Sequence, residues 1–84
     1  MTVLAVFRSR SHTIDFLSRL ARYGISAQAV NTPKEAGVGC GLSAKFNISA
    51  LAQAKNLLRN NHYSSFVGFF KLDILYGRSV VTPI

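Results

Sequence analysis

The sequence predicts a ferredoxin-like α+β sandwich, in which one four-stranded antiparallel sheet carries both helices on one face. Three observations predict this fold: short strand-like segments, two amphipathic segments with helical spacing, and their order β-α-β-β-α-β along 84 residues. A chain of this length forms one small domain and buries about 60–65% of its unfolded surface. We assign residues 1–71 to that domain. Residues 72–84 form a C-terminal extension, either an extra strand or a dimerisation arm.

The N-terminal segment predicts a central strand followed by a helix. Residues 2–7 (TVLAVF) form the short apolar run of a buried strand. Ser11 or Thr13 is placed to cap a helix that runs to about Tyr23. Gly24 is its predicted C-terminal stop, because glycine readily adopts the left-handed conformation found there.

The middle of the chain predicts two further strands separated by a loop. Residues 26–31 (SAQAVN) indicate a weak second strand, and residues 32–39 form a loop punctuated by proline and glycine. In residues 42–46 (LSAKF) apolar and polar side chains alternate, which is typical of a half-buried third strand.

The last predicted elements are a helix and a fourth strand. Asn47 or Ser49 caps a helix that ends near residues 60–61, with leucine and alanine at helical spacing on its buried side. Residues 66–70 (FVGFF) form a strand that is apolar on both faces.

The usual spatial strand order for this topology is 4-1-3-2, and it leaves one sheet face without helices. The side chains expected on that face are Leu4, Val6, Val67 and Phe69. An apolar second face on a small sheet must be covered, here by the C-terminal segment or by a partner subunit. We expect a homodimer.

Composition narrows the functional classes. Ten Lys and Arg residues against three acidic residues give a formal net charge of +7, which favours an anionic partner. The basic residues are dispersed, so no nucleic-acid tail is predicted. No apolar run reaches the roughly 18 residues that span a bilayer. The short apolar start lacks a preceding basic residue, so we expect no signal peptide and a cytoplasmic location.

Cys40 is the only cysteine, and it stands between Gly39 and Gly41. With the strand order above, the start of the third strand meets the end of the first strand and the beginning of the first helix. Cations and a helix N-terminus favour the thiolate form of a cysteine. The glycines leave the sulfur uncrowded. The polar and basic residues expected at this edge are Arg8, Arg10, Ser11, His12, Lys34 and His62.

Other chemistries lack a pattern in this chain. One cysteine and two histidines have no familiar metal-ligand spacing, and we expect neither a metal nor an organic cofactor. No Ser-His-acid set and no paired carboxylates indicate acid/base catalysis. A lone cysteine is also often a small buried hydrophobe, and a histidine near a helix cap is often a plain surface residue.

The stretch TPKEAGVGCGLSAKF (residues 32–46) resembles the selenium/sulfur carrier-like family of small bacterial domains. The similarity covers about residues 2–71. The matching positions are Thr32, Pro33, Lys34, Cys40, Gly41, Lys45 and Phe46. The resemblance implies a non-enzymatic carrier in which Cys40 holds a persulfide or perselenide. It also implies an acidic donor or acceptor protein, such as a cysteine desulfurase or selenocysteine lyase.

Two other functions stay open at this point. The chain could be a regulatory or structural dimer that binds a small anion at the first helix N-terminus, with Cys40 a bystander. It could also be a single-stranded RNA-binding module, as many small ferredoxin-like domains are. The aromatic-rich signatures of such modules are missing from residues 2–7 and 42–46, so nucleic acid is not the expected partner.

Overall fold

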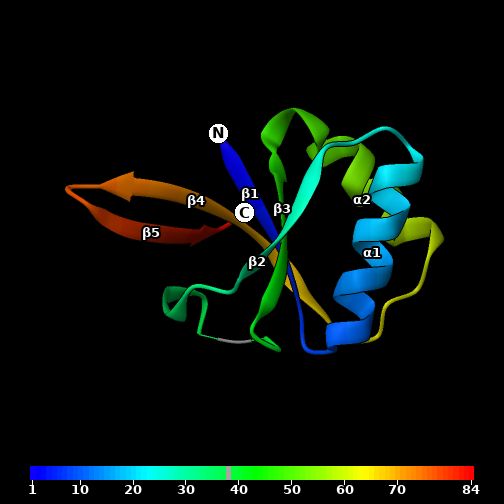
Figure 1. Ribbon diagram of the computed structural model, residues 1–84, viewed down its shortest axis with the longest axis horizontal. Helices are drawn as coiled ribbons and strands as arrows, with labels where there is room; N and C mark the ends of the chain where they lie inside the picture. Colours follow the sequence, from blue (N-terminus) through cyan, green and yellow to red (C-terminus); the bar gives the residue numbers. More distant parts are fainter. Residues whose placement is uncertain (38) are drawn as a thin grey trace.

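The computed structural model describes residues 1–37 and 39–84 and has an α+β fold with two helices against an antiparallel sheet (Figure 1). Val38, within the loop predicted for residues 32–39, lies outside the described residues. The sheet has the strand order β2-β3-β1-β4-β5. The elements are β1 (Thr2–Phe7), α1 (Arg10–Arg22), β2 (Ala27–Asn31), the 3-10 helix η1 (Lys34–Ala36), β3 (Leu42–Asn47), the 3-10 helix η2 (Ile48–Ala50), α2 (Leu51–Asn60), β4 (Phe66–Leu75) and β5 (Arg78–Pro83).

The sheet has five strands, so the prediction of a four-stranded ferredoxin-like sheet is corrected, although the α+β class and the order of the first four strands are confirmed. β4 continues to Leu75, and the chain then reverses and pairs β5 antiparallel to β4. The reversal uses two residues with positive φ, Tyr76 at 52° and Gly77 at 75°. Positive φ at both central residues is typical of a type I′ turn, whose backbone twist matches that of the two strands it joins. The hairpin extends away from the helices (Figure 1).

The main core lies between the sheet and the helices. It joins Val3, Ala5 and Phe7 of β1 to the buried side chains of both helices. Phe69 packs into this core against Phe46, so the prediction that Phe69 points away from the helices is wrong. The cause is a register shift between Val6 and Phe7 in the β1–β4 pairing. This bulge adds one residue to β4, so Phe66 and Phe69 both face the helices although simple alternation would put them on opposite faces. Phe66 and Phe69 both contact the core through it.

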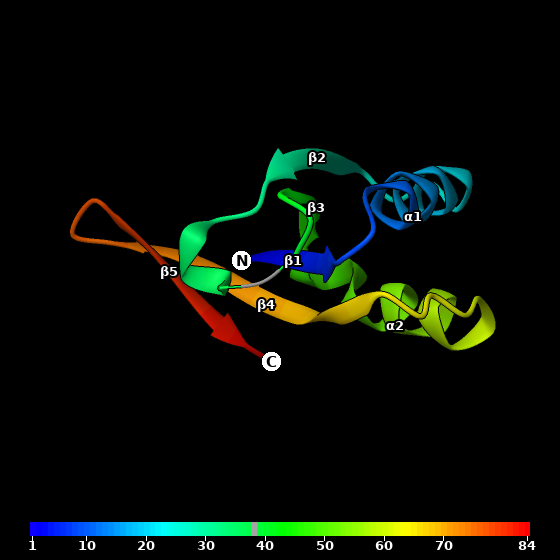
Figure 2. The same ribbon diagram turned by 90° about the horizontal axis from the view of Figure 1, so that it is seen from below.

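Around β1 the second sheet face is covered by the chain itself. Leu4 and Val6 are fully buried although they lie outside the helix-side core, as the alternation along β1 predicts. The loop between β2 and β3 crosses this face, and its helix η1 contacts β5. Figure 2 shows β5, the edge strand of the sheet, passing beside η1. The expected homodimer is a separate matter and stays a prediction.

Helix α1 begins earlier than predicted. Ser9 is its N-cap: it has extended backbone angles, and its hydroxyl accepts a hydrogen bond from the His12 amide. Ser11 and Thr13 lie inside the helix, so neither is the cap. The predicted end is confirmed, because Tyr23 is the C-cap and Gly24 has a φ of 73°. These bounds place the first turn of α1 directly after β1.

Helix α2 is preceded by a short 3-10 turn. Asn47 caps that turn, with its side-chain oxygen accepting from the Ser49 amide. Ala50 is the N-cap of α2 itself, so neither Asn47 nor Ser49 caps α2 as predicted, whereas the predicted end at Asn60 is confirmed. Its buried side chains Ala54 and Leu57 join the core. The segment from residue 61 to 65 then leads back to the edge where β1 ends, since the Arg8 amide donates to the Ser65 carbonyl.

Candidate functional site

Cys40 lies where the end of β1, the start of β3 and the first turn of α1 meet. Its amide donates a hydrogen bond of 3.0 Å to the Phe7 carbonyl, the last residue of β1. The base of the loop is closed by the Thr32 amide, which donates to the Gly41 carbonyl at 2.9 Å. Cys40 is a half-buried, unbridged cysteine. The loop thus meets the β1–α1 connection, as the predicted topology required.

The Cys40 sulfur has two polar contacts among the described residues. Cys40 Sγ lies 3.4 Å from the Leu42 carbonyl oxygen, to which the thiol donates. It also lies 3.8 Å from the hydroxyl oxygen of Thr13 in α1. Thr13 is fully buried, so one side of the sulfur faces the protein interior.

The two glycines beside Cys40 have different roles. A Cβ atom on Gly39 would come within 2.8 Å of Val6 Cγ1 and 3.3 Å of the Phe7 carbonyl oxygen. Gly39 therefore lets the loop lie directly on the end of β1. Gly41 has open space where a side chain would stand, but its φ is 89°, which residues other than glycine rarely adopt. Position 39 thus requires glycine for close packing, and position 41 requires it for its backbone angle.

A network of hydroxyl groups holds the first turn of α1. The Ser65 hydroxyl accepts a hydrogen bond from the Ser9 amide at 3.2 Å and lies 2.6 Å from His12 Nδ1. The Ser9 and Ser11 hydroxyls are 2.9 Å apart. The His12 ring also packs edge-on against Tyr63. His12 is therefore held in place beside the loop edge by Ser65 and Tyr63.

The predicted cations lie around this edge with exposed side chains. Arg8 follows β1, Arg10 begins α1, and Lys34 begins η1. The two ion pairs among the described residues, Arg19–Asp15 and Lys71–Asp73, involve none of the three. Their charges are consequently open to an anionic ligand or partner.

Three other predicted residues, Thr32, Lys45 and His62, occupy other positions in the fold. The Thr32 hydroxyl hydrogen-bonds with the buried Ser43 hydroxyl on the second sheet face. Lys45 pairs with Leu4 and Gln28 farther along β3. His62 is exposed in the segment that follows α2. These positions assign Thr32 to loop anchoring, because it holds the loop to β3.

A polar cluster one turn along α1 ties this helix to the segment before β4. Arg19 Nε donates to the Tyr63 hydroxyl at 2.9 Å and to the Asp15 carboxylate at 3.0 Å. The Tyr63 hydroxyl donates to Asp15, which holds the pKa of that carboxyl below its ordinary value, with Arg19 adding to the effect. Partial burial, followed by the Asp15 contact, raises the pKa of Tyr63 to about 12. The cluster fixes the α2–β4 segment that carries Ser65.

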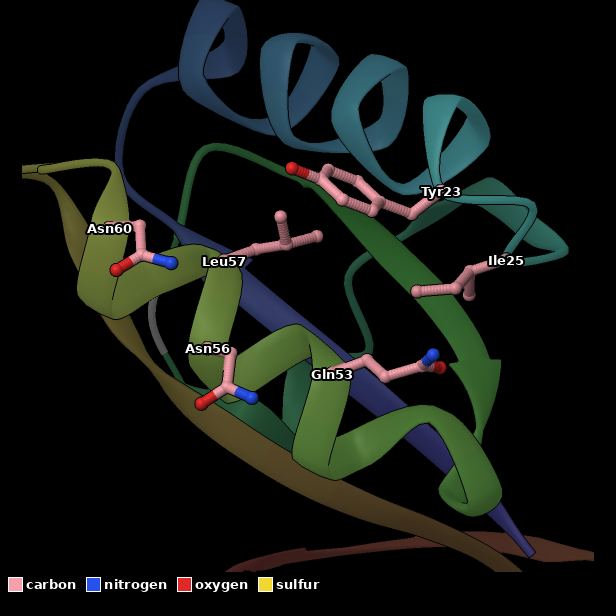
Figure 3. Close-up of a pocket in the computed structure, with 6 residues that line it drawn as sticks. All are labelled: Tyr23, Ile25, Gln53, Asn56, Leu57 and Asn60. Atoms are coloured by element: carbon pink, nitrogen blue, oxygen red, sulfur yellow. The ribbon is translucent and has the colours of Figure 1, made fainter.

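The pocket drawn in Figure 3 lies at the other end of α1, between its C-terminus and α2. It measures about 170 Å³ and contains none of the predicted site residues. Its lining is Tyr23, Ile25, Gln53, Asn56, Leu57 and Asn60. A shallow hollow does adjoin the Cys40 loop, and Thr32, Lys34, Gly39 and Gly41 contribute to its wall.

The described residues hold neither a metal-binding cluster nor a membrane-spanning helix. No group of three or more His, Cys, Asp and Glu side chains is placed there to bind a metal ion. None of the helices in this part of the chain combines the length and apolar character needed to cross a membrane.

Sequence reasoning missed three residues at this edge: Ser9, Thr13 as a neighbour of the sulfur, and Ser65. Ser9 carried only the signal of its residue type, which Ser11 and Thr13 share, since each of these hydroxyl residues can cap a helix. Thr13 and Ser65 carried none, since their roles depend on where distant segments meet. Ser65 is 53 positions from its partner His12.

Comparison with known proteins identifies one family. Residues 2–65 match the model of the family described as "Putative Se/S carrier protein-like". No curated protein and no solved structure matches the chain. The matched segment runs from β1 to Ser65 and so includes the whole Cys40 edge. It covers well over half of the 84 residues, and the chain therefore belongs to the Se/S carrier protein-like family.

Proposed function

We propose that this protein carries sulfur or selenium on Cys40 as a persulfide or perselenide and delivers it to an acceptor protein. The observation that carries the proposal is the position of the only thiol, half-buried at the first turn of α1 with exposed arginines and a lysine at the same edge. Family membership supports a carrier role, and the edge supplies chemistry that fits it. A helix N-terminus and nearby cations stabilise a sulfur anion.

Loading is a thiol exchange in which no external oxidant is needed. The Cys40 thiolate attacks the outer sulfur of a persulfide on the donor protein. A new bond forms between the two sulfurs, and the donor thiolate leaves with the electron pair of the broken bond. Selenium transfers in the same way from a donor perselenide. Delivery repeats the exchange: an acceptor nucleophile attacks the outer atom, and the Cys40 thiolate leaves.

The donor and acceptor that fit this surface carry acidic docking faces. Arg8 and Arg10 are exposed where β1 leads into α1, and Lys34 lines the hollow beside the Cys40 loop. Glu35 is the single acidic residue in η1. Complementary charge speeds encounter and orients the partner. A cysteine desulfurase or a selenocysteine lyase with an acidic face would meet this requirement.

Intact-mass spectrometry tests the proposal directly. The protein is incubated with a cysteine desulfurase and cysteine, or with a selenocysteine lyase and selenocysteine, without added reductant. Wild type should gain the mass of one sulfur or one selenium atom, and a thiol reductant should remove it. Because Cys40 is the only cysteine, Cys40→Ser is a complete control. The same gain in Cys40→Ser, or no gain in wild type with either donor, would overturn the proposal.

A further inference from the structure

The Thr13 hydroxyl is a fully buried polar group beside the only thiol. Its oxygen lies 3.8 Å from Cys40 Sγ, 3.2 Å from the Leu42 carbonyl oxygen and 3.3 Å from the Ser9 carbonyl oxygen. A helix interior offers a threonine hydroxyl the carbonyl four residues earlier, which here is Ser9. The contacts with Leu42 and Cys40 are instead long-range, and they connect α1 to the start of β3.

Counting hydrogens shows why this arrangement depends on the state of the sulfur. The Thr13 hydroxyl has one hydrogen and so donates to one acceptor at a time. In the thiol form, Cys40 itself donates to the Leu42 carbonyl, and Thr13 donates to a carbonyl oxygen. A thiolate has no hydrogen to donate and becomes an acceptor. The Thr13 hydroxyl is the donor that the described contacts place beside it.

We propose that Thr13 turns its hydroxyl hydrogen to the Cys40 thiolate and stabilises it, in both the loading and the delivery steps. This inference rests on the proposed carrier function. When the thiol ionises, its proton passes to solvent, the hydrogen bond from sulfur to Leu42 is lost, and the hydrogen bond from Thr13 to sulfur forms. In delivery the acceptor nucleophile attacks the outer sulfur, and the thiolate that leaves is the same anion. Hydrogen bonds to charged acceptors are the stronger ones.

The charged and titratable groups on the surrounding elements are shared by all the variants compared below, so the comparison isolates the hydroxyl. They are Arg8 after β1, Arg10 and His12 in the first turn of α1, Lys34 and Glu35 in η1, and His62 and Tyr63 before β4.

Thr13→Val removes the hydroxyl and keeps the shape of the side chain, whereas Thr13→Ser keeps the hydroxyl. Ser18→Ala is the matched control, because Ser18 is an exposed hydroxyl farther along the same helix. The measurement is the rate of Cys40 alkylation by iodoacetamide from neutral to strongly alkaline pH. Thermal melts establish that each variant is folded, and Thr13→Ala replaces Thr13→Val if the latter does not fold.

At neutral pH, Thr13→Val should react about three- to tenfold more slowly than wild type, since it lacks one hydrogen bond to the anion. Its rate curve should shift to higher pH and reach the wild-type plateau once the thiol is fully ionised. Thr13→Ser and Ser18→Ala should follow the wild-type curve. An unshifted curve for the variant without the hydroxyl, or a lower plateau with no shift, would overturn the role of Thr13.

The alkylation assay uses no sulfur donor, so it is independent of the carrier test. If Thr13→Val shifts the curve while wild type gains no sulfur, the carrier proposal fails and the hydrogen bond stands. If wild type loads sulfur while Thr13→Val alkylates at the wild-type rate at every pH, the carrier proposal stands and the role of Thr13 is wrong.

Discussion

The Cys40 amide donates a 3.0 Å hydrogen bond to the carbonyl oxygen of Phe7, and this bond joins the cysteine loop to the last residue of β1. Because β1 continues into the first turn of α1, the bond also sets the distance between the sulfur and that helix. The residue that makes the bond possible is Gly39, which lies directly on Val6 and Phe7. The packing of Gly39 should therefore control both the stability of the loop and the position of the sulfur.

Gly39→Ala should destabilise the protein more than Gly41→Ala. An alanine Cβ at position 39 would lie 2.8 Å from Val6 Cγ1 with a φ of 111°, so overpacking adds to backbone strain. We expect a loss of about 2–4 kcal/mol in the free energy of unfolding for Gly39→Ala. Gly41→Ala has open space and only the strain of its φ, so we expect about 1–2 kcal/mol. Urea denaturation measures both values, and equal losses would contradict the packing role of Gly39.

The meeting of the cysteine loop with α1 could be predicted because it follows from topology alone. In an antiparallel sheet with β3 beside β1, the start of one strand lies at the end of the other, whatever the side chains are. The side of Phe69 depends on the register shift near Val6. The sequence marks this place only by Gly68, the partner of Val6, because a glycine inside a strand often marks a bulge, but that signal does not say which residues change face. The fifth strand lacks a clear hairpin signal, because its turn places Tyr76 at positive φ, where asparagine or glycine is the usual residue.

At the start of α1, too, the sequence predicts the kind of residue that caps the helix but not which residue does so. Ser9, Ser11 and Thr13 are three hydroxyl residues at alternate positions, and each could cap a helix by type alone. The choice of Ser9 depends on Ser65, whose hydroxyl accepts from the Ser9 amide across 56 positions of sequence. A tertiary contact of this kind has no local signal.

Ser9→Ala should cost about 1 kcal/mol of unfolding free energy, because it removes the side-chain acceptor of the His12 amide. Ser11→Ala should leave stability nearly unchanged, since Ser11 is exposed and lies inside α1. Each substitution removes one hydroxyl group from a serine, and the two positions are two residues apart, so each variant controls for the other. Chemical denaturation with a matched urea gradient compares them, and a larger loss for Ser11→Ala would contradict the assignment of the cap.

Tyr63→Phe should destabilise the protein at neutral pH, because it removes the hydrogen bonds of the Tyr63 hydroxyl. The stability difference between the two proteins should disappear at alkaline pH. The pKa of Tyr63 is raised from 10.0 to about 12, so its folded environment favours the protonated phenol. The contribution is therefore fully present below pH 10 and disappears as the pH rises through about 12. Near neutral pH we expect wild type to be more stable by about 0.5–1 kcal/mol, the worth of partly exposed hydrogen bonds.

Unfolding midpoints of both proteins, measured from pH 8 to pH 12, follow this stability difference. The difference should shrink between pH 10, the ordinary pKa of tyrosine, and about pH 12, the raised pKa of Tyr63. Tyr23→Phe is the matched control, because it removes the same hydroxyl from a tyrosine that is 68% exposed and takes no part in the Asp15–Arg19–Tyr63 hydrogen bonds. A gap between wild type and Tyr63→Phe that is constant up to pH 12 would contradict the raised pKa of Tyr63.

The Asp15 carboxylate should stabilise the protein at neutral pH and lose this effect in acid, whereas the Tyr63 hydroxyl loses its effect in alkali. Its pKa is lowered by the Tyr63 hydroxyl and by Arg19, so its contribution is present above the ordinary value of 3.8 and is lost as the pH falls through the lower folded value. Asp15→Asn should therefore be less stable than wild type near neutral pH and approach it in strong acid. Acid titration of the two proteins, followed by circular dichroism, measures the gap. A gap that widens as the pH falls below 3.8 would contradict the lowered pKa of Asp15.

Arg10→Glu should slow sulfur loading from an acidic donor, because Arg10 is an exposed cation at the start of α1, beside the Cys40 edge. At low salt we expect a reduction of about three- to tenfold in the loading rate, as charged groups at the rim of an interface act mainly on the rate of encounter.

Lys55→Glu is the matched control. It changes the net charge by the same amount on the exposed side of α2 and should load at nearly the wild-type rate. The rate is followed by intact mass with a cysteine desulfurase and cysteine. Raising the salt concentration should bring the three proteins together, because exposed charges are then screened. Equal slowing by both reversals would mean that only net charge matters, and the docking role of the Cys40 edge would be wrong.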